Sequence, residues 1–432
     1  MRSGAVKAGR IALLPALLAL WLSARALGAE PDASGWKSKV RLSGDLKSYF
    51  LAVEPVEIAG NSLTQDQPLE GLNQNKLRLR LAVAPSAQVN FELAYEILPT
   101  VQGSLTAIAP NLSFAPAAPA YRVDDLDANL YPKPGERGGG FILGQNLDRA
   151  LVTVSGKRGS LTIGRQAIAF GAAHVISPTD IIAPYAFNAL DTEYRIGVDA
   201  VRAKIALRAM SELDLGTIFG QDFNWSRSAA FARAAFPVKT NQLGLTAIEF
   251  QDNLLAGASL TRTLGGAGVW LEGAYTWAKL FEQPRPEQDY VRASAGLDYN
   301  FNVKNGLYVF LEYHYNGAST GDPGQYLDQA GEVAYREGGV YLLGRHYLSP
   351  GTAFQITPLL AFNFASLVNV ADGSFYLLPK VEYNSSENVY LALGADVAVG
   401  RPARMESPAG IAPQSEFGLY PTFYFTSIRL YF

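Results

Sequence analysis

Two short stretches of the chain place basic side chains at every second position. Arg78 and Arg80 form one pair, and Arg202 and Lys204 form a second pair that Arg208 extends. Side chains two residues apart lie on the same face of a β-strand. If both stretches are strands, each presents a basic row suited to carboxylate groups, which it would bind through charge-assisted and often bidentate contacts. The alternative is that these cations are solvated or paired with acids on neighbouring strands.

A second group of charged residues surrounds an apolar passage that has no regular period. Residues 181–190 are largely apolar, are interrupted by Pro184, and follow neither a strand nor a helix pattern. The charged candidates in and around this passage are Arg165, Asp180, Asp191, Glu193 and Arg195, and Arg41 is a further basic candidate near the start of the chain. Gly164 is expected to mark a bulge that turns Arg165 toward the inside of the fold.

The residues needed for catalysis or metal binding are scarce. The chain has no cysteine, which excludes disulfides, thiolate chemistry and a Cys-ligated metal or haem. Its three histidines, His174, His314 and His346, have no partner at a metal-binding spacing. A Gly-x-Ser-x-Gly match around Ser319 opens a long loop and does not join a strand to a helix, so it does not indicate a hydrolase. We therefore expect no catalytic residues, no metal site and no cofactor.

The elements that carry the charged rows alternate between apolar and polar residues. Residues 39–50, 76–83, 89–97, 291–301 and 389–397 all have this period of two, with Leu77, Leu79 and Leu81 opposite Arg78 and Arg80 in one of them. A soluble antiparallel sandwich would alternate in the same way. The segments run to about 9 to 12 residues, however, which is the length of a tilted strand that crosses a bilayer.

The connections between these segments alternate between short and long. Short ones are expected near residues 84–87, 156–159, 210, 237–241, 264–266, 303–306, 349–352 and 384–388. Longer ones are expected near residues 52–75, 99–140, 170–197, 221–227, 279–288, 317–337, 365–373 and 400–415. The one exception is at residues 251–253, where a short connection is expected although the alternation calls for a long one. Turns on one side and loops on the other are typical of an outer-membrane β-barrel.

We therefore predict an all-β fold, a closed antiparallel transmembrane β-barrel of about 18 strands, with 16 as the alternative. Short turns would face the periplasm and long loops the outside. A sheet in lipid must pair all its backbone groups, and only a closed sheet does so. The chain ends on Phe432 with Ile428 and Leu430 in the same phase, which resembles the terminal signal of bacterial outer-membrane proteins.

The start of the chain has the pattern of a secretory signal peptide. Basic residues precede an apolar stretch at 11–24, and small residues follow at 26–29. Removing residues 1–29 would remove four basic and no acidic side chains, leaving 32 basic against 39 acidic residues. This balance does not favour a nucleic-acid partner. Residues 30–432 are read as a single barrel domain in the bacterial outer membrane.

A barrel of this size has an interior too wide for side chains to fill, so its function is expected in the lumen. The inward phase of the clearest strands holds as many acidic as basic candidates, Glu272 and Glu312 among them. Apolar residues such as Ile181 and Phe187 would not remain in an exposed loop. We predict that residues 170–197 fold into the pore mouth and constrict it. Asp180, Asp191, Glu193 and Arg195 would then pair with charged wall residues. Packing against outer loops is the alternative.

The passage at 164–202 also resembles a known family. Gly164-Arg165-Gln166, Pro178-Thr179-Asp180 and Asp191-Thr192-Glu193-Tyr194-Arg195, followed by Gly197-Val198-Asp199-Ala200 and Arg202, are similar to the signature of alginate-export outer-membrane barrels. The likeness covers residues 147–208, and many uncharacterised porins share it. It implies an eighteen-stranded channel more strongly than it implies alginate.

These observations favour a channel for passive passage of polar or anionic solutes, and the resemblance implies a polyuronate exporter. The alternatives are a general diffusion porin, a surface adhesin and a sleeve around a partner such as a multihaem cytochrome. The expected partners are outer-membrane lipid and a small polar or anionic solute or a polysaccharide, with periplasmic partners left open. The residues expected to line the pore and contact solute are Arg41, Arg78, Arg80, Arg165, Asp180, Asp191, Glu193, Arg195, Arg202, Lys204 and Arg208.

Overall fold

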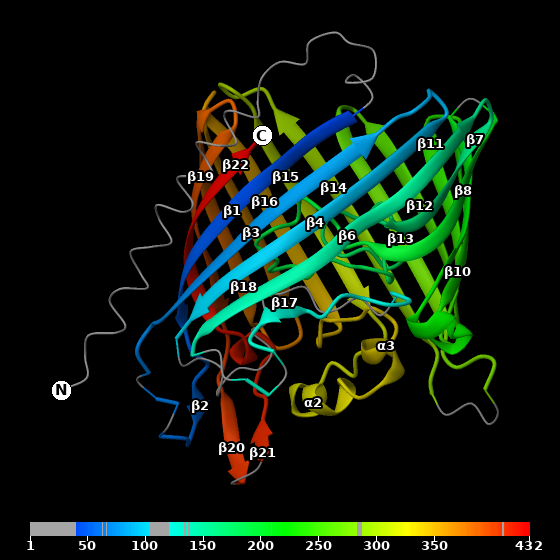
Figure 1. Cartoon of the computed structure of the whole chain (residues 1–432). Coiled ribbons are helices and arrows are strands. Elements are labelled where there is room, and N and C mark those ends of the chain that lie inside the picture. The colour runs from blue at the N-terminus through cyan, green and yellow to red at the C-terminus, as the bar shows by residue number, and fades with distance from the viewer. Residues whose placement is uncertain are drawn as a thin grey trace.

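A computed structural model describes residues 40–432 except 63, 66, 104–120, 134, 137–138, 209, 283–286 and 408–409. The described chain forms a closed antiparallel barrel in which consecutive long strands are neighbours (Figure 1). The first half of the ring contains β1 (Val40–Glu54), β3 (Glu70–Val83), β4 (Val89–Gln102), β6 (Phe141–Gly156), β7 (Gly159–Gln166), β8 (Val198–Arg208), β9 (Ser211–Ile218), β10 (Ala229–Val238) and β11 (Asn241–Phe250). The second half contains β12 (Asn253–Leu264), β13 (Ala267–Trp277), β14 (Tyr290–Phe301), β15 (Leu307–Asn316), β16 (His346–Thr357), β17 (Leu360–Asn369), β18 (Phe375–Ser386), β19 (Val389–Val399) and β22 (Thr422–Tyr431).

These are the eighteen barrel strands of the described residues, which confirms the predicted number and not the alternative of sixteen. The sheet closes because β1 pairs with both β22 and β3. A short strand, β5 (Asn129–Tyr131), adds only to one end of β6. In the part of the chain that the structure describes, no helix is long and apolar enough to cross a membrane.

The two ends of the barrel differ in the length of their connections (Figure 1). The short turns and the C-terminus lie at one end, called the turn end, and the long connections lie at the other, called the loop end. Beyond the loop end lie β2 (Ile58–Ala59), β20 (Ala403–Ser407) and β21 (Gly410–Ala412), which form a small three-stranded sheet. The short helices there are α2 (Tyr326–Gln329), α3 (Val333–Arg336) and 3₁₀ turns at Gln221–Phe223, Trp225–Arg227, Pro323–Gln325 and Phe417–Leu419.

All but one of the predicted short connections lie between consecutive strands, and the tight join after β11 is present, with Gln251 and Asp252 at positive φ. The exception is the turn predicted at residues 349–352, which is wrong. Pro350 and Gly351 form a typical turn pair, but they lie inside β16, where the ring of Phe310 packs so closely on Gly351 that no β carbon would fit. The actual turn joins β16 to β17 after Thr357.

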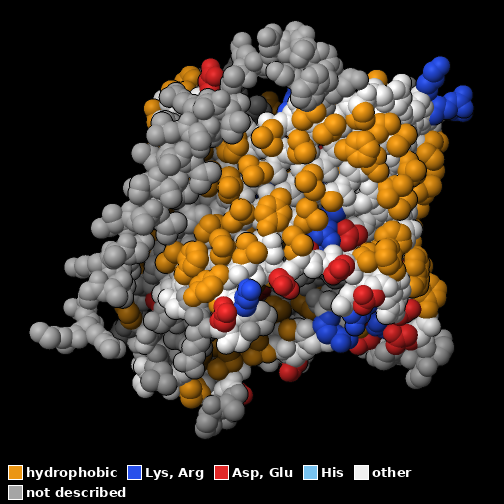
Figure 2. Space-filling model, in the orientation of Figure 1, with side chains coloured by type: hydrophobic (Ala, Val, Ile, Leu, Met, Phe, Trp, Pro, Cys, Tyr) orange, Lys and Arg blue, Asp and Glu red, His pale blue; other side chains and the backbone are white. Residues whose placement is uncertain are grey.

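The outer face of the barrel is apolar and its inner face is polar. On β1, Leu42 and Phe50 are 60% and 51% exposed, whereas Asp45 and Lys47 are buried. This is the reverse of a soluble protein, and the predicted alternation is confirmed. Figure 2 shows hydrophobic side chains spread as a belt over the strands of the visible face. Such a belt requires contact with lipid, because a monomeric soluble protein rarely exposes so large an apolar surface.

The predicted signal peptide, residues 1–29, lies outside the described residues, so it stays a prediction.

The contact between β1 and the C-terminal residue beside β22 leads to a prediction about assembly of the barrel. Gly44 exchanges two backbone hydrogen bonds with Phe432, of 2.8 and 2.9 Å. A β carbon on Gly44 would lie 2.5 Å from the carbonyl oxygen of Arg78 and 2.7 Å from the Phe432 ring. We expect Gly44→Val to reduce the fraction of protein that shows heat-modifiable migration on gels. Gly71→Val on β3 is the control, because nothing lies within 4 Å of a β carbon there. Equal folded fractions for the two variants would contradict this closure.

Candidate functional site

Residues 167–197, between β7 and β8, turn into the barrel and are called the inward segment. Ile168, Ile181 and Ile182 are at most 4% exposed and belong to one apolar cluster with inward side chains of β8 to β13. Ile176 packs in a second cluster with residues of β16 to β18, and Leu190 packs on a third from β1, β3 and β22. Because these clusters lie on different arcs of the ring, the inward segment crosses the interior and contacts opposite walls.

A buried carboxylate on β13 holds one part of the inward segment. Glu272 is 3% exposed and accepts hydrogen bonds from the backbone N–H groups of Ala172, Ala173 and Thr179, at 2.6 to 3.0 Å. The hydroxyls of Ser177 and Thr179 donate to the same carboxylate. Irregular buried backbone must find acceptors, and a buried carboxylate must find donors. Each therefore satisfies the other, and this part of the segment is fixed against the wall.

A second wall carboxylate, on β15, holds the next three residues. Glu312 is 1% exposed and accepts from the backbone N–H groups of His174, Val175 and Ile176. The indole N–H of Trp270 on β13 also donates to it, at 2.8 Å. The ring of His174 stacks on Trp270 with centroids 3.8 Å apart. Residues 174–176 of the inward segment are thus held by charge-assisted hydrogen bonds, which are about twice as strong as neutral ones.

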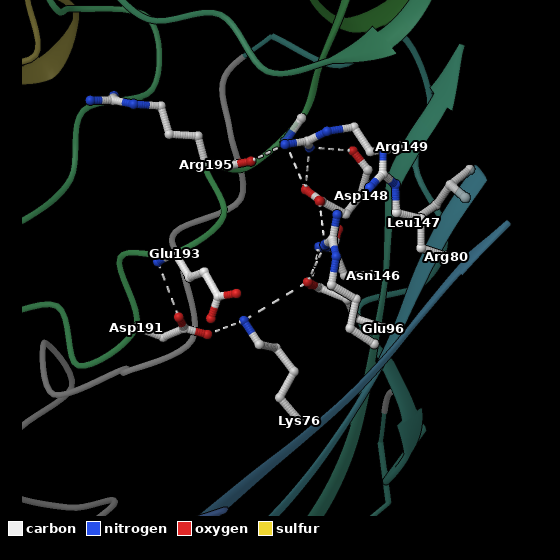
Figure 3. A network of polar contacts seen from close by, with 12 residues as sticks. Lys76, Arg80, Glu96, Asn146, Leu147, Asp148, Arg149, Asp191, Glu193 and Arg195 are labelled. Atoms are coloured by element: carbon white, nitrogen blue, oxygen red, sulfur yellow. Dashed lines mark hydrogen bonds and ion pairs between the residues drawn. The ribbon is translucent and has the colours of Figure 1, made fainter. Parts of the chain in front are cut away.

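The far end of the inward segment is anchored by ion pairs to β1 and β3, and Figure 3 shows the pair of Lys76 on β3 with Asp191. Lys47 is fully buried, and its Nζ lies 2.9 Å from Asp191 and 2.6 Å from Glu193. Lys76 also pairs with Asp191. The hydroxyl of Tyr431 on β22 donates to Glu193 at 2.7 Å. The predicted pairing of Asp191 and Glu193 with charged wall residues is therefore present.

The charge network continues along the wall from β3 to β6 (Figure 3). Arg78 pairs with Glu96 at 2.6 Å and with Asp148, and Arg149 lies 2.8 Å from the same Asp148. Arg149 returns to the inward segment by donating to the carbonyl oxygen of Arg195 at 2.7 Å. The network therefore joins the inward segment to three wall strands through alternating charges.

Ionisation of Asp191 depends on these cations. Burial alone would raise its pKa, but Lys76 and Lys47 outweigh burial and hold the pKa of Asp191 at about 2. The pKa of Glu193 is lowered as well, because Lys47 and Tyr431 overcome the opposing effect of burial. Both carboxylates are thus charged throughout the neutral range.

Two other predicted residues of the segment pair differently from the prediction. Asp180 and Arg195 form an ion pair with each other and not with the wall. Arg195 also donates to the carbonyl oxygen of Ala183 and lies over the ring of Tyr185, 4.6 Å from its centroid. Burial raises the pKa of Asp180 in spite of its pairing with Arg195. This internal pair stiffens the segment near its middle.

Arg165 lies at the rim and pairs with Asp199 and Asp125, both at 2.8 Å. The bulge predicted at Gly164 is absent, since β6 and β7 pair without a register shift through this position. Gly164 does have a φ of 112°. The register shift occurs instead between β4 and β6, beside Asp148.

The remaining predicted cations divide into paired and unpaired residues. Ion pairs join Arg80 to Glu92 at 2.8 Å, Arg202 to Asp214 at 2.6 Å, and Lys204 to Glu212 at 3.3 Å. Arg41 and Arg208 are exposed near the turn end and have no ion pair with another described residue. The basic rows are therefore matched by acids on adjacent strands, and solute binding by them stays a proposal.

Several residues of the site, among them Lys76, Glu272 and Glu312, were not in the predicted pore-lining set. Lys76 lies two residues before Arg78 on the same face, so the period of β3 could have identified it. Glu272 and Glu312 were placed on the inner wall by the strand period, but nothing in the sequence showed that they bind the inward segment. Among the described residues, no group of three or more imidazole and carboxylate side chains could hold a metal.

No protein-family model and no curated protein sequence matches the chain. Solved structures do match it. Pseudomonas aeruginosa OpdK with vanillate has a TM-score of 0.51 and 11% identity, over 91% of this chain and 99% of that chain. P. aeruginosa OccK2 (OpdF) with glucuronate has a TM-score of 0.52 and 12% identity, over 91% and 96%. Acinetobacter baumannii OccAB3 has a TM-score of 0.54 and 8% identity, over 91% and 99%.

The chain has the fold of an outer-membrane porin. This fold and the apolar belt place it in the outer membrane of a Gram-negative bacterium. The comparisons support the barrel-porin part of the sequence resemblance, and they give no support to its alginate-export part.

The ion pairs of the buried Lys47 with Asp191 and Glu193 lead to a test of stability. Asp191→Asn should lower the free energy of unfolding at pH 7 by about 1 to 3 kcal/mol, because the buried Lys47 would keep only Glu193 as a charged partner. Glu212→Gln is the matched control; it breaks the exposed pair with Lys204 and should cost only about 0.2 to 1 kcal/mol. Chemical unfolding of detergent-solubilised protein measures both.

The effect of Asp191→Asn on the free energy of unfolding should depend on pH. A carboxyl group with a lowered folded pKa stabilises the fold above its unfolded pKa and loses that contribution as the pH falls through its folded pKa. For Asp191 this window runs from 3.8 down to about 2. The stability difference between wild type and Asp191→Asn should therefore be full at pH 7 and shrink across this window. A difference that is constant down to pH 2 would contradict the assigned ion pairs.

Proposed function

We propose that the protein is a passive channel for small polar or anionic solutes and that the inward segment constricts it. The main support for this proposal is that the segment is anchored on both sides of the ring. Glu272 and Glu312 hold it on one wall. Lys47 and Lys76 hold it on the other wall. A segment held in this way narrows the lumen of the closed barrel. The proposal includes no catalytic role.

The preference for anionic solutes is supported by the accessible cations and by the neighbours. The side chains of Arg80 and Lys204 are 46% and 40% exposed, so solutes can compete for them with Glu92 and Glu212. Arg41 and Arg208 are exposed near the turn end. OpdK was solved with vanillate and OccK2 with glucuronate, and both compounds carry a carboxylate group. Arg or Lys side chains bind such groups through charge-assisted contacts.

The buried cations Arg78, Arg165 and Arg202 have a different proposed role. Each is paired with at least one acid and little exposed, so we propose that they shape the wall and that solutes contact the accessible cations. The segment residues Asp180, Asp191, Glu193 and Arg195 would set the position of the constriction. Passage of a polyuronate rests on the sequence resemblance alone and is the weaker candidate.

A sleeve around a protein partner is less favoured by the same geometry. A partner inside the barrel would have to replace the apolar contacts of Ile168, Ile181 and Leu190 with the wall. It would also have to displace the N–H groups bound to Glu272 and Glu312, which would leave the buried Glu272 without its segment donors and Glu312 with Trp270 as its remaining donor. Open conductance of the purified chain separates the two functions.

Single-channel recording in planar bilayers tests the constriction. Wild type should conduct without a partner, and deletion of residues 172–188 should raise the conductance because it removes the part of the segment that spans the interior. Deletion of residues 403–412, the hairpin of β20 and β21 beyond the loop end, is the control and should leave conductance unchanged (Figure 1). A wild type that never conducts would overturn the channel, and unchanged conductance after the first deletion would overturn the constriction.

Ion selectivity tests the role of the accessible cations. The double substitution Arg80→Gln and Lys204→Gln should lower the ratio of anion to cation permeability, because it leaves Glu92 and Glu212 unpaired in the lumen. Reversal potentials in a potassium chloride gradient measure this ratio. Arg262→Gln is the control, since Arg262 lies in the outward phase of β12 with the exposed Leu264. A ratio that does not change in the double variant would rule out these residues as solute contacts.

A further inference from the structure

One buried arginine of the inner wall has no partner. Arg292 lies on β14, is 4% exposed, and occupies the same inward face as Ser294. Its Nε and Nη1 are buried and make no hydrogen bond. Within the described ranges, no carboxylate comes within ion-pair distance of its guanidinium. A charged group that is both desolvated and unpaired is rare in proteins, because removing a charge from water without a partner is strongly unfavourable.

The other buried cations of the described chain show that this is unusual for the protein itself. Lys47, Arg78, Arg122, Arg149 and Arg165 are each at most 8% exposed. Every one of them has an acidic partner within 4.0 Å. The barrel therefore neutralises buried cations with its own acids wherever it can, and Arg292 is the exception.

The acids nearest along the wall are already occupied. Glu272 and Glu312 lie on the strands that flank β14, and both oxygens of each accept hydrogen bonds from the inward segment. Neither carboxylate can turn toward Arg292 without releasing those donors. The inward segment has thus taken up the hydrogen-bond-accepting positions of the two carboxylates nearest to this arginine along the wall.

The residues in register with Arg292 supply no negative charge either. Ala274 on β13 and Asn316 on β15 are its direct cross-strand partners. The side-chain amide of Asn316 donates to the carbonyl oxygens of Leu342 and Gly344, and its oxygen accepts from the backbone N–H of Ala318. The immediate surroundings of the guanidinium are therefore neutral.

The next row of the wall is neutral as well. The hydroxyl of Ser294 donates to the carbonyl oxygen of Ile176 at 2.5 Å. It therefore accepts from Nδ1 of His314, at 2.8 Å. This chain of two hydrogen bonds links the wall to the inward segment and offers no acceptor to Arg292.

We propose that Arg292 binds a small monovalent anion inside the barrel wall, between β14, the inward segment and the loop at 317–345. A halide or the carboxylate group of a small solute has the required chemistry, a single negative charge that accepts hydrogen bonds from the guanidinium of Arg292. The bound anion supplies the hydrogen-bonded acceptor that Glu272 and Glu312 do not give this arginine. This site does not depend on the proposed channel function, since it is defined by burial and pairing and not by passage of solute.

Anomalous diffraction from wild-type crystals tests the site without any substitution. Crystals grown without halide and soaked in sodium bromide should show an anomalous peak within hydrogen-bonding distance of the guanidinium of Arg292. Soaking in formate in place of bromide distinguishes a site that also takes carboxylates from one that takes halides only, and density at the guanidinium in either soak supports the proposal. The absence of both, at concentrations where other surface sites fill, would overturn it.

Thermal unfolding supplies a solution test with a matched control. At constant ionic strength, replacing the bulky anion isethionate by chloride should raise the wild-type unfolding midpoint, and the rise should saturate with chloride concentration. Arg292→Met should lose this response. Arg202→Met should keep it, because the guanidinium of Arg202 is neutralised by Asp214. Equal chloride responses in wild type and Arg292→Met would contradict an anion at Arg292.

Discussion

Closure of the sheet is the constraint on which the rest of this structure depends. In lipid every backbone N–H and C=O must be paired within the protein, and the pairing of β1 with both β22 and β3 meets that requirement. Once the ring is closed, apolar residues face out and charged residues face in. The interior then contains many ionisable groups at low exposure, and each of them needs a partner.

Charge pairing inside the ring determines where the inward segment lies. Lys47 is fully buried on β1 and is neutralised by Asp191 and Glu193, which the segment supplies. On the opposite wall the carboxylates belong to the wall, and backbone N–H groups of the segment donate hydrogen bonds to Glu272 and Glu312. Without the segment, buried wall groups would lack ion-pair and hydrogen-bond partners, and the segment would lack its acceptors on the wall. The proposed constriction and the proposed anion site at Arg292 both follow from this exchange.

The sequence was sufficient to predict the barrel because the strand signal is local. Alternation of side chains along β1 or β3 depends only on residues within one strand, and the lengths of turns and loops can be read directly. The turn expected at Pro350 and Gly351 was wrong because Phe310, forty residues earlier, fills the space beside that glycine. The site was predicted less completely. The pairing of Asp191 with Lys47 joins residues 144 positions apart, and no local pattern shows whether Arg195 will pair with the wall or with Asp180.

The measurement that most directly tests the account is zero-length carbodiimide coupling of the folded protein in detergent, followed by mass spectrometry. This reagent joins only amines and carboxylates in ion-pair contact. We expect an amide between Lys76 and Asp191, which requires the inward segment to reach the wall at β3, together with the exposed neighbour pair Lys204 and Glu212 as an internal standard. Formation of the second link without any link from Lys76 or Lys47 to the segment would contradict the account.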